Sequence, residues 1–555
     1  MIVPNPWEAS YPAALRNYRL DLSGLPPHPA DFAREAAQAF GAAPAFTLVL
    51  PSGHRAQLTF AEVDALSDTL SAFFRDSLGL APGDVIAIQL PNTLHYPVAV
   101  FGAWKAGLIA TLVNPMYTAS ECERQLRDSG AKVLIVCDLF LTRSAAAVRA
   151  CGVRLVLASL WDFFPAPVAE AVRAAMDGEA GAGLQTDLPH VRFMDAIAPR
   201  PVSSAPPGHR PAVVLFQYTG GTTGESKAAA ITAAYILSAM QMIADYLRAH
   251  DNAVAGGTTL TVLPLYHIFA FVLGFLLYFR AGSHNVLIAN PRPLSNVRPA
   301  FDGFPIDWMA GVDTLYAGLL AEPWFRAKPP RLRFALAGGT ATRPSTAAAW
   351  EALVGPLVEG YGLTESTCIV ASNPPGAGRR MGSVGLPLPG CTIRIVDDEG
   401  RDCAIGRPGE LLVSGPQIVG GYRGAPEVDG DAFVDGWFRT GDIAVMDEAG
   451  YLTLVDRKKD IVLVSGFNVY PNEVEAVIAA HPAVVEAAVI GLGDARTGEA
   501  LRAFVVTRDP ALSGEAVIAH CRDHLAAYKT PKDIVFLDAL PKSPVGKILR
   551  AKLRS

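Results

Sequence analysis

The segment from Tyr218 to Ala230, YTGGTTGESKAAA, has the composition of a loop that binds phosphate. It contains three glycines, three threonines, one serine and one lysine in thirteen residues. Glycine lets a backbone approach phosphate closely, backbone N–H groups and hydroxyls donate to it, and lysine adds a positive charge. The common nucleotide loop has its lysine directly after a glycine, whereas two residues separate Gly224 from Lys227. This spacing excludes Walker geometry, and from this segment alone a surface turn is an equally good interpretation.

Four further segments carry side chains that could take part in nucleotide chemistry. In EGYGLTES (359–366), the carboxylate could hold Mg²⁺ beside a phosphate, and the tyrosine could stack on a base. In DGWFRTGDIA (435–444), an aspartate after a glycine turn could accept hydrogen bonds from ribose hydroxyls. Basic side chains come from VDRKKDIVLVSGFNVYPNEVE (455–475) and LPKSPVGKILR (540–550). Taken singly, each segment is explained at least as well by an ordinary turn, a linker or a solvated helix.

Taken together, in this order and at this spacing, the five segments resemble the adenylate-forming (ANL) superfamily. Its members are acyl-CoA synthetases, peptide-synthetase adenylation domains and luciferases. The resemblance extends over the chain from about residue 40. Three segments are most similar to bacterial long-chain fatty-acid CoA ligases, namely LPLYHIFA (263–270), residues 441–475 and LPKSPVGKILR.

The resemblance implies a two-step ligase that uses ATP, Mg²⁺ and CoA. A carboxylic acid, expected to be a medium- or long-chain fatty acid, is activated as acyl-AMP with release of pyrophosphate. The acyl group then passes to the thiol of CoA, and AMP is released. Ligases for dicarboxylic or aryl acids, and enzymes that load a carrier protein, stay open as alternatives. A non-enzymatic binding module is disfavoured by the complete set of motif residues, and an unrelated phosphotransferase by the failed Walker spacing.

Carried over position by position, the resemblance implies a role for each motif residue. The catalytic residues are Lys547, His267, Thr364 and Glu365. ATP and AMP are held by Thr219, Thr222, Thr223, Lys227, Gly338, Gly339, Thr340, Tyr361, Thr364, Asp442, Arg457 and Lys547. Glu365 and Thr223 hold the metal ion. Lys459 is the hinge about which a small C-terminal domain rotates, which exchanges Lys547 for Val464, Ser465, Gly466 and Phe467 in the thioester step.

The phosphate loop departs from the family pattern at two positions. Ser226 stands where the family usually has proline, and Ala228 stands where it usually has glycine. Loss of proline frees φ at that position, so we expect weaker binding of the ATP phosphates, with Lys227 still contributing. Ala228 is tolerable if its φ is negative. The following ITAAYI also lacks the family's frequent His/Asn pair.

An α/β scaffold must position these segments. Apolar runs at 84–90, 108–114 and 131–138 alternate with helical patterns at 95–107 and 118–129, which predicts a parallel sheet. Further strands are expected at 212–218, 259–265 and 332–339, and a helix over 228–247. The predicted fold class is α/β, with a large N-terminal domain of parallel α/β sheets (1–457), including a small β-rich module at about 391–457. A small mobile α+β C-terminal domain (458–555) follows the charged DRKKD segment.

Composition excludes several other classes of protein. The net charge of −6 gives no indication of nucleic-acid binding, and the basic last 35 residues are interpreted as a solvated helix face. Seven cysteines without a CxxC pair support neither a zinc site nor a disulfide framework. The N-terminal MIVPNPWEAS lacks the pattern of a signal peptide.

Residues 252–279 contain no Asp, Glu, Lys or Arg and could suggest a membrane helix. Gly256, Gly257, Pro264 and His267 interrupt the run, which favours a buried strand, a loop and a buried helix. No transmembrane segment is therefore expected, and a cytoplasmic location fits. A fatty-acid substrate would allow transient peripheral contact with a membrane. The oligomeric state stays open, a homodimer included.

Overall fold

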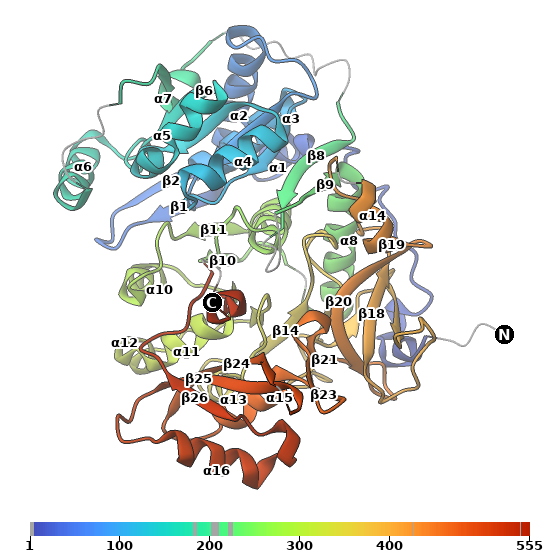
Figure 1. The fold of residues 1–555 in the computed structure, drawn as a ribbon. Coiled ribbons are helices and arrows are strands. Elements are labelled where there is room, and N and C mark those ends of the chain that lie inside the picture. Colours follow the sequence, from blue (N-terminus) through green and yellow to red (C-terminus); the bar gives the residue numbers. More distant parts are fainter. Residues whose placement is uncertain are drawn as a thin grey trace.

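The computed structural model describes residues 5–180, 186–200, 210–219, 226–252, 254–424, 426–494, 496–543 and 546–554. Two large sheets with helices packed on them form most of the molecule (Figure 1). A β-rich module lies beside them, and a small α/β unit formed by the C-terminal residues lies below them in this view. This arrangement confirms the predicted fold class. The boundary at 457/458 and the mobility of the C-terminal unit stay predictions.

The first large sheet is parallel except for its last strand pair. Its strand order is β7-β6-β5-β3-β4-β8-β9. The strands are β3 Val85–Gln89, β4 Ile109–Leu112, β5 Ala131–Cys137, β6 Arg154–Ala158, β7 His190–Arg192, β8 Val213–Tyr218 and β9 Ala228–Thr232. Ile86 and Ile88 face the main core, whereas Val85 and Ala87 face a second buried cluster. Burial of both faces explains the continuous apolar runs in the sequence.

The second large sheet has nine strands in the order β16-β15-β14-β13-β12-β10-β11-β1-β2. Its central strands are parallel, and antiparallel strands close both edges. The strands are β1 Pro44–Val49, β2 Arg55–Thr59, β10 Thr258–Thr261, β11 His284–Leu287, β12 Trp308–Gly311, β13 Phe334–Ala337, β14 Leu357–Tyr361, β15 Ala371–Ser372 and β16 Leu386–Pro387. The loops beyond the carboxyl ends of β10, β12, β13 and β14 carry the candidate site, as expected for open α/β sheets.

The helices pack on the sheets, and four of the described ones begin at a residue whose side chain caps the helix. They are α1 Phe32–Phe40, α2 Phe60–Ala72, α3 His95–Lys105, α4 Ala119–Ser129, α5 Asp138–Cys151, α6 Ala166–Ala180, α7 Phe193–Ala196, α8 Ala233–Ala249, α9 Tyr278–Arg280, α10 Arg298–Gly303, α11 Asp313–Ala321, α12 Pro323–Ala327, α13 Pro344–Leu353, α14 Pro426–Ala432, α15 Pro471–Ala479 and α16 Gly514–His524. Thr118 caps α4 in a capping box with Glu121, which confirms the predicted start of this helix.

Shorter helical turns connect the main elements. They are η1 Pro6–Ser10, η2 Ala13–Leu15, η3 Pro29–Asp31, η4 Phe73–Ser77, η5 Ala270–Leu277, η6 Leu294–Val297, η7 Lys458–Asp460, η8 Ala527–Lys529 and η9 Arg550–Leu553. The uncharged run forms strand β10, a loop and the buried π-helix η5, as predicted. Phe271 and Phe275 of η5 pack against Trp104 and Phe101, so this face of the run is core. Among the described residues, no helix is both long and apolar enough to cross a bilayer.

Two predictions from the sequence are wrong. In their described part, the last 35 residues form the end of α16, short helical turns and a strand, Asp533–Phe536, rather than one solvated helix face. Residues 228–232, AAAIT, form strand β9 rather than the first turns of a helix, and α8 begins at Ala233. Alanine favours helix, but this segment pairs antiparallel with β8 and is buried in the sheet edge. Thr232 then accepts from the N–H of Tyr235 and caps α8. Pairing with a neighbouring strand thus overrides the local propensity.

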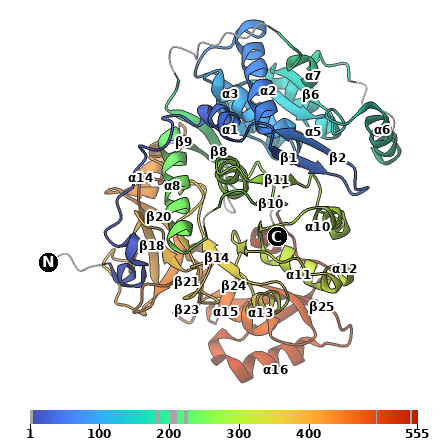
Figure 2. The same ribbon diagram turned by 180° about the vertical axis from the view of Figure 1, so that it is seen from behind.

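The β-rich module is antiparallel throughout. Its strands are β17 Thr392–Val396, β18 Gly409–Ser414, β19 Phe433–Val434, β20 Trp437–Met446 and β21 Leu452–Arg457. The N-terminal segment ties this module to the rest of the molecule, and both views show it running along that side (Figures 1 and 2). Ser10 donates to the Ala449 carbonyl of the module at 2.7 Å, and Tyr18 donates to Asp245 of α8 at 2.9 Å.

The C-terminal residues form a separate sheet with its own core. The strands are β22 Val462–Val464, β23 Phe467–Val469, β24 Val484–Asp494, β25 Gly498–Thr507 and β26 Asp533–Phe536. Helices α15 and α16 pack on this sheet. The segment that follows β26 leads back to the large sheets and brings Lys547 to their carboxyl edge (Figure 1).

Candidate functional site

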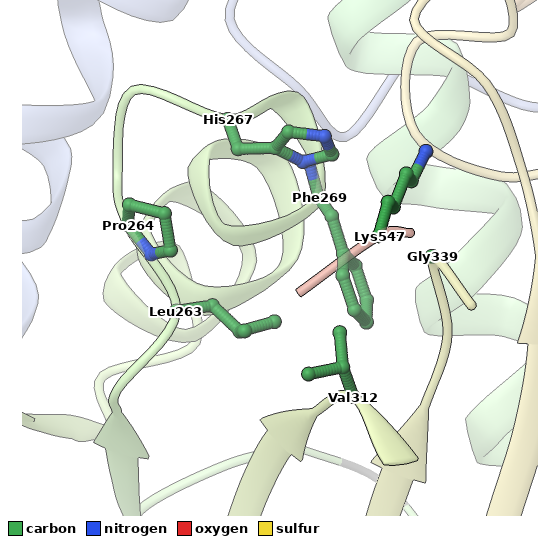
Figure 3. Close-up of a pocket in the computed structure, with 7 residues that line it drawn as sticks. All are labelled: Leu263, Pro264, His267, Phe269, Val312, Gly339 and Lys547. Carbon is green, nitrogen blue, oxygen red and sulfur yellow. The ribbon is translucent and has the colours of Figure 1, made fainter. Parts of the chain in front are cut away.

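A small pocket lies where the C-terminal segment meets the second large sheet (Figure 3). Seven residues line it, namely Leu263, Pro264, His267, Phe269, Val312, Gly339 and Lys547. All but Lys547 come from the loops after β10, β12 and β13. The cavity volume is about 10 Å³, about the room for one water. Lys547 thus lies against these loops, and little free space is left between them.

His267 is held as a neutral hydrogen-bond donor in the pocket wall. Its N–H donates to the Pro264 carbonyl at 3.0 Å, and its carbonyl accepts from Phe271 at 2.9 Å. Its Nδ1 accepts from the N–H of Phe269 at 3.3 Å, which leaves the proton on Nε2. Burial, reinforced by the charge of Lys547, lowers the pKa of His267 to about 3. His267 can thus donate to a carboxylate at neutral pH without carrying charge.

A tight turn presents Lys547 to the site. Ser543 donates its N–H to the Lys547 carbonyl at 2.7 Å, and its hydroxyl accepts from the Lys547 N–H at 3.1 Å. Gly546 has a φ of +84°, and a Cβ there would lie 3.1 Å from Thr314 Oγ1. Glycine is therefore required for both the turn and the close approach to α11. Burial and Arg457 lower the pKa of Lys547, against the opposing effects of Asp442 and Glu365.

Asp442 and Arg457 face each other through strand register. The two residues are directly paired between β20 and β21, and Arg457 Nε lies 2.8 Å from Asp442 Oδ1. Tyr361, at the end of β14, donates its hydroxyl to the other carboxylate oxygen at 2.5 Å. Tyr361 is buried, and this burial raises the pKa of its phenol. A fixed carboxylate therefore lies near Lys547, and the predicted contact of Asp442 with ribose stays a prediction.

The turn after Tyr361 is tight and strained. A Cβ on Gly362 would lie 1.7 Å from the Cys368 carbonyl oxygen, so only glycine fits. Thr367 has a φ of +47°, which is rare for a β-branched residue. Such strain is often kept at functional sites. The turn exposes Thr364 partly and buries the Glu365 carboxylate, whose Oε1 accepts from the Tyr422 hydroxyl at 2.6 Å.

Two glycines after β13 let the loop pass close to neighbouring atoms and adopt a left-handed turn. A Cβ on Gly338 would lie 3.3 Å from both the Gly360 carbonyl and the Phe269 ring, and Gly339 has a φ of +76°. The Oγ1 of Thr340 is buried and has no hydrogen-bond partner among the described residues. An unpartnered buried hydroxyl is costly unless a ligand satisfies it. This observation fits the predicted nucleotide contact of Thr340.

The two ends of the phosphate loop are held together as an extension of the β8–β9 hairpin. Thr219 donates its N–H to the Lys227 carbonyl at 2.8 Å, and the Ser226 hydroxyl donates to the Thr219 carbonyl at 2.5 Å. Ala228 is a buried residue of β9 with ordinary negative φ, so its methyl group causes no strain. Thr222 and Thr223 lie outside the described residues.

The predicted thioester residues lie on the exposed β22–β23 turn. Ser465 and Gly466 have φ values of +52° and +82°, the pattern of a tight hairpin turn. Phe467 is 57% exposed and stacks on Tyr528, with ring centroids 4.8 Å apart. None of these residues lines the pocket. The structure thus brings Lys547, rather than this turn, to the pocket.

The predicted hinge residue, Lys459, lies in η7 between the β-rich module and the C-terminal sheet. Its neighbour Lys458 contacts Glu410 and Asp398, both at 3.1 Å. On the other side, Asp460 pairs with Arg554 at 3.0 Å. Burial, followed by the nearby Arg457, lowers the pKa of Lys459. Its role as a hinge stays a prediction.

The donor set suits Mg²⁺ that arrives with phosphates. In the described part of the chain, no group of three or more His, Cys, Asp or Glu could hold a metal ion alone. Mg²⁺ at phosphate sites commonly uses one or two carboxylates, substrate oxygens and waters. Glu365 Oε2 accepts no hydrogen bond from the described residues, so one carboxylate oxygen is left for such an ion.

Sequence reasoning missed Tyr422 and Arg550. Tyr422 contacts both Glu365 and Lys227, and Arg550 pairs with Glu475 of α15. The only sequence signals are a tyrosine directly after two glycines and an arginine three residues after Lys547. Neither signal identifies a partner, because Glu365, Lys227 and Glu475 are all distant in sequence from the residues they contact.

Family models and curated relatives match most of this chain, and their descriptions agree with one another. The family model described as AMP-binding enzyme matches residues 33–423, and that described as AMP-binding enzyme C-terminal domain matches residues 473–547. A protein of Yersinia pestis named long-chain-fatty-acid–CoA ligase is 40% identical over 512 residues, which cover 90% of this chain and 89% of that protein. One of the same name from Bacillus subtilis (strain 168) is 32% identical over 510 residues, covering 90% of each.

Solved structures also superpose over nearly the whole chain. ATP-bound MatB from Rhodopseudomonas palustris has a TM-score of 0.80 and 27% identity, covering 95% of this chain and 98% of that one. The anthranilate CoA ligase AuaEII in complex with anthranoyl-AMP has a TM-score of 0.82 and 27% identity, covering 96% and 98%.

Proposed function

Because the chain belongs to the AMP-binding enzyme family, we propose that it converts a long-chain fatty acid to its CoA thioester through an acyl-AMP. It is an AMP-forming acid–thiol ligase that uses ATP, Mg²⁺ and CoA. One observation carries the assignment to this site. The Lys547 side chain lines an apolar pocket with neutral His267, and Asp442 and Arg457 lie close enough to influence its pKa.

In the first half-reaction, a carboxylate oxygen of the acid attacks the α-phosphorus of ATP. The new O–P bond forms as the bond to the β-phosphate oxygen breaks, and pyrophosphate leaves with the electron pair. Negative charge builds on the α-phosphoryl oxygens, where the Lys547 ammonium stabilises it. His267 Nε2–H would hold the attacking carboxylate, and Asp442 would accept from the ribose hydroxyls.

Mg²⁺ would be held by Glu365 together with phosphate oxygens, and when bound it neutralises phosphate charge. On the protein side, Lys227 lies at the end of the phosphate loop, where it would bind the leaving pyrophosphate. Thr364 offers a partly exposed hydroxyl on the same turn as Glu365. These residues would therefore contact the triphosphate from two separate loops, the one after β8 and the one after β14.

In the second half-reaction, the CoA thiol loses its proton to solvent and the sulfur attacks the acyl carbonyl. The C–S bond forms, the C–O bond to AMP breaks, and AMP leaves with the electron pair. We propose that rotation about Lys459 withdraws Lys547 and brings the turn at Ser465, Gly466 and Phe467 to the pocket. Gly466 would let the pantetheine arm pass close to the backbone, since a Cβ there meets nothing within 4 Å.

The pocket wall favours an acid with an apolar body. Leu263, Pro264, Phe269 and Val312 line it, and Lys547 is the only charged side chain among the lining residues that the structure describes. Neutral His267 offers no cation for a second carboxylate. A dicarboxylic acid would leave a buried charge without a partner, which is costly. Between aliphatic and aryl acids, the long-chain relatives at up to 40% identity favour the aliphatic class.

The assignment is tested by two sequential assays. With ATP and Mg²⁺, palmitate should cause pyrophosphate release, and CoA should then cause AMP release. Malonate and benzoate serve as dicarboxylic and aryl comparisons. Pyrophosphate release with benzoate and none with any fatty acid would overturn the substrate class. Acyl-AMP formation without transfer to CoA would instead indicate a carrier protein as acceptor.

The cellular location of the enzyme follows from the acid that it is proposed to use. We propose a cytoplasmic enzyme that meets its acid at a membrane surface transiently, since a long acyl chain partitions into lipid. Co-sedimentation with vesicles that contain palmitate tests this contact. The absence of any vesicle-bound fraction would contradict it. Light scattering of the same preparation would give the molar mass in solution and so distinguish a monomer from a homodimer.

The pH dependence of adenylation should report Lys547. Its pKa is lowered, so the cation is lost as pH rises through a value below that of an ordinary lysine. We expect kcat/KM for ATP to fall on the alkaline side, because this parameter reports the free enzyme. Lys547→Arg keeps its charge and should remove this alkaline limb. An identical limb in the variant would contradict the assignment.

Ser226 should compensate in part for the missing proline. Ser226→Ala removes the hydroxyl that joins the two ends of the loop, and one such hydrogen bond contributes about 1 kcal/mol. We expect the KM for ATP to rise about fivefold with little change in kcat. Ser226→Pro should bring the KM to or below the wild-type value. Steady-state pyrophosphate release measures both, and an unchanged KM in Ser226→Ala would contradict the role of this bond.

A further inference from the structure

Tyr422 lies between the two charged groups expected to bind the metal and the pyrophosphate. Its hydroxyl donates to Glu365 Oε1 at 2.6 Å, and its ring centroid lies 5.7 Å from Lys227 Nζ. Lys227 and Glu365 are 138 residues apart in sequence, so this ring is what joins them.

The backbone of Tyr422 is fixed from both sides. It forms an isolated antiparallel bridge with Ala229 of β9, and the next residue, Arg423, donates to the Ala228 carbonyl at 2.8 Å. The Tyr422 N–H donates to Asp429 Oδ1 at 2.8 Å. On the other side, Val419 donates to the Glu365 carbonyl at 2.9 Å. Residues 419–423 therefore lie between β9 and the turn that carries Glu365.

The contacts divide the tyrosine into two functional parts. The hydroxyl occupies one oxygen of Glu365 and thereby fixes the direction of the other, which matters for a cation that demands near-octahedral geometry. The ring offers its negative face to the ammonium of Lys227, a side chain that is otherwise exposed. Fixing both groups before the nucleotide binds reduces the ordering cost of binding.

We propose that Tyr422 is a positioning residue that orients Glu365 for Mg²⁺ through its hydroxyl and holds Lys227 near the pyrophosphate through its ring. This inference rests on the proposed function, because it assigns Glu365 and Lys227 to the metal and phosphate side of that site. It adds a residue that acts through these two groups and does not contact the acyl chain.

Two substitutions separate the two parts. Tyr422→Phe removes the hydroxyl and keeps the ring, so the Kd for Mn²⁺ in the presence of ATP should rise about tenfold, since hydrogen bonds to charged groups are strong. The Kd for ATP at saturating metal should stay within about twofold of wild type. Tyr422→Leu removes the ring as well and should raise that ATP Kd about two- to fivefold further.

Binding is measured without acid, by electron paramagnetic resonance of Mn²⁺ and by calorimetry of Mg²⁺–ATP, so neither readout depends on turnover. Tyr451→Phe is the matched control, since its hydroxyl donates to the Gly378 carbonyl at 2.6 Å and its ring faces Arg380. Thermal melting of all three variants reports folding. If Tyr422→Leu fails to fold, the Tyr422→Phe result alone decides on the hydroxyl.

The outcomes are distinct. A weaker metal affinity in Tyr422→Phe, with melting like that of Tyr451→Phe, supports the inference. Unchanged metal affinity overturns it, as does an equal loss in both Tyr→Phe variants. If the wild type binds Mg²⁺–ATP but releases no pyrophosphate with any acid, the proposed function fails while the metal titrations still decide on Tyr422.

Discussion

Lys547→Ala is expected to lower acyl-AMP formation at least ~100-fold in kcat, while thioester formation from supplied acyl-AMP and CoA stays within about threefold of wild type. Loss of one preorganised group that stabilises developing charge typically costs ~100- to 1,000-fold. The lysine is well placed for this role, because its turn is fixed by Ser543 and by the close approach of Gly546 to Thr314. Single-turnover measurements of each half-reaction give the two rates separately.

The control for this prediction is Lys542→Ala, which removes another lysine of the same segment. Lys542 pairs with Glu486 on β24 and does not line the pocket, so both half-reactions should stay near wild type. An equal loss of both half-reactions in Lys547→Ala would contradict the exchange of Lys547 for the β22–β23 turn. Unchanged acyl-AMP formation would contradict the assignment of Lys547 itself.

The sequence predicts the central strands and the positions of the motifs well, for a physical reason. Strands such as β3 and β5 are buried on both faces, so nearly every residue in them must be apolar. The motif residues follow such strands or tight glycine turns, where local sequence is decisive. Tyr361 is the last residue of β14, and Asp442 lies fifteen residues before Arg457, its partner on the next strand.

What the sequence alone cannot predict is pairing between distant segments. The strand β9 exists because β8 lies beside it, although alanine favours helix. Tyr422 meets Glu365 only because residues 419–423 cross from β9 to the turn after β14. Likewise, the state with Lys547 in the pocket depends on contacts between the C-terminal segment and α11. These contacts depend on tertiary packing and leave no periodic signal in the sequence.

Arg550 illustrates the same point and leads to the second large effect. Its guanidinium lies 2.9 Å from both carboxylate oxygens of Glu475 and 2.8 Å from Asn472 Oδ1. Its side chain is only 17% exposed and also lies 3.6 Å from Asp460 in η7. Arg550 therefore fastens the segment that carries Lys547 to α15 and to the region of the predicted hinge.

Arg550→Gln should lower acyl-AMP formation ~10- to 100-fold and leave thioester formation from supplied acyl-AMP within about threefold of wild type. Removing one partner of a buried ion pair costs about 3–5 kcal/mol, because the other charge is left buried and unpaired. Burial already raises the pKa of Glu475 in spite of Arg550, so the carboxylate should take up a proton in the variant. The remaining free-energy cost should therefore loosen the C-terminal segment that carries Lys547. We expect this loosening to lower kcat for adenylation while the KM for ATP stays near the wild-type value.

Arg554→Gln is the matched control, because Asp460, at 3.0 Å, is the one acidic partner of Arg554 among the described residues, and the Arg554 side chain is 37% exposed. It should change either half-reaction less than threefold, as exposed pairs contribute little. Arg550→Lys keeps the charge but loses the bidentate geometry, so it should restore only part of the adenylation rate. Equal slowing of both half-reactions by Arg550→Gln would show that Arg550 does not position Lys547. The same conclusion would follow if Arg550→Gln kept its full adenylation rate and had a melting temperature no lower than that of Arg554→Gln.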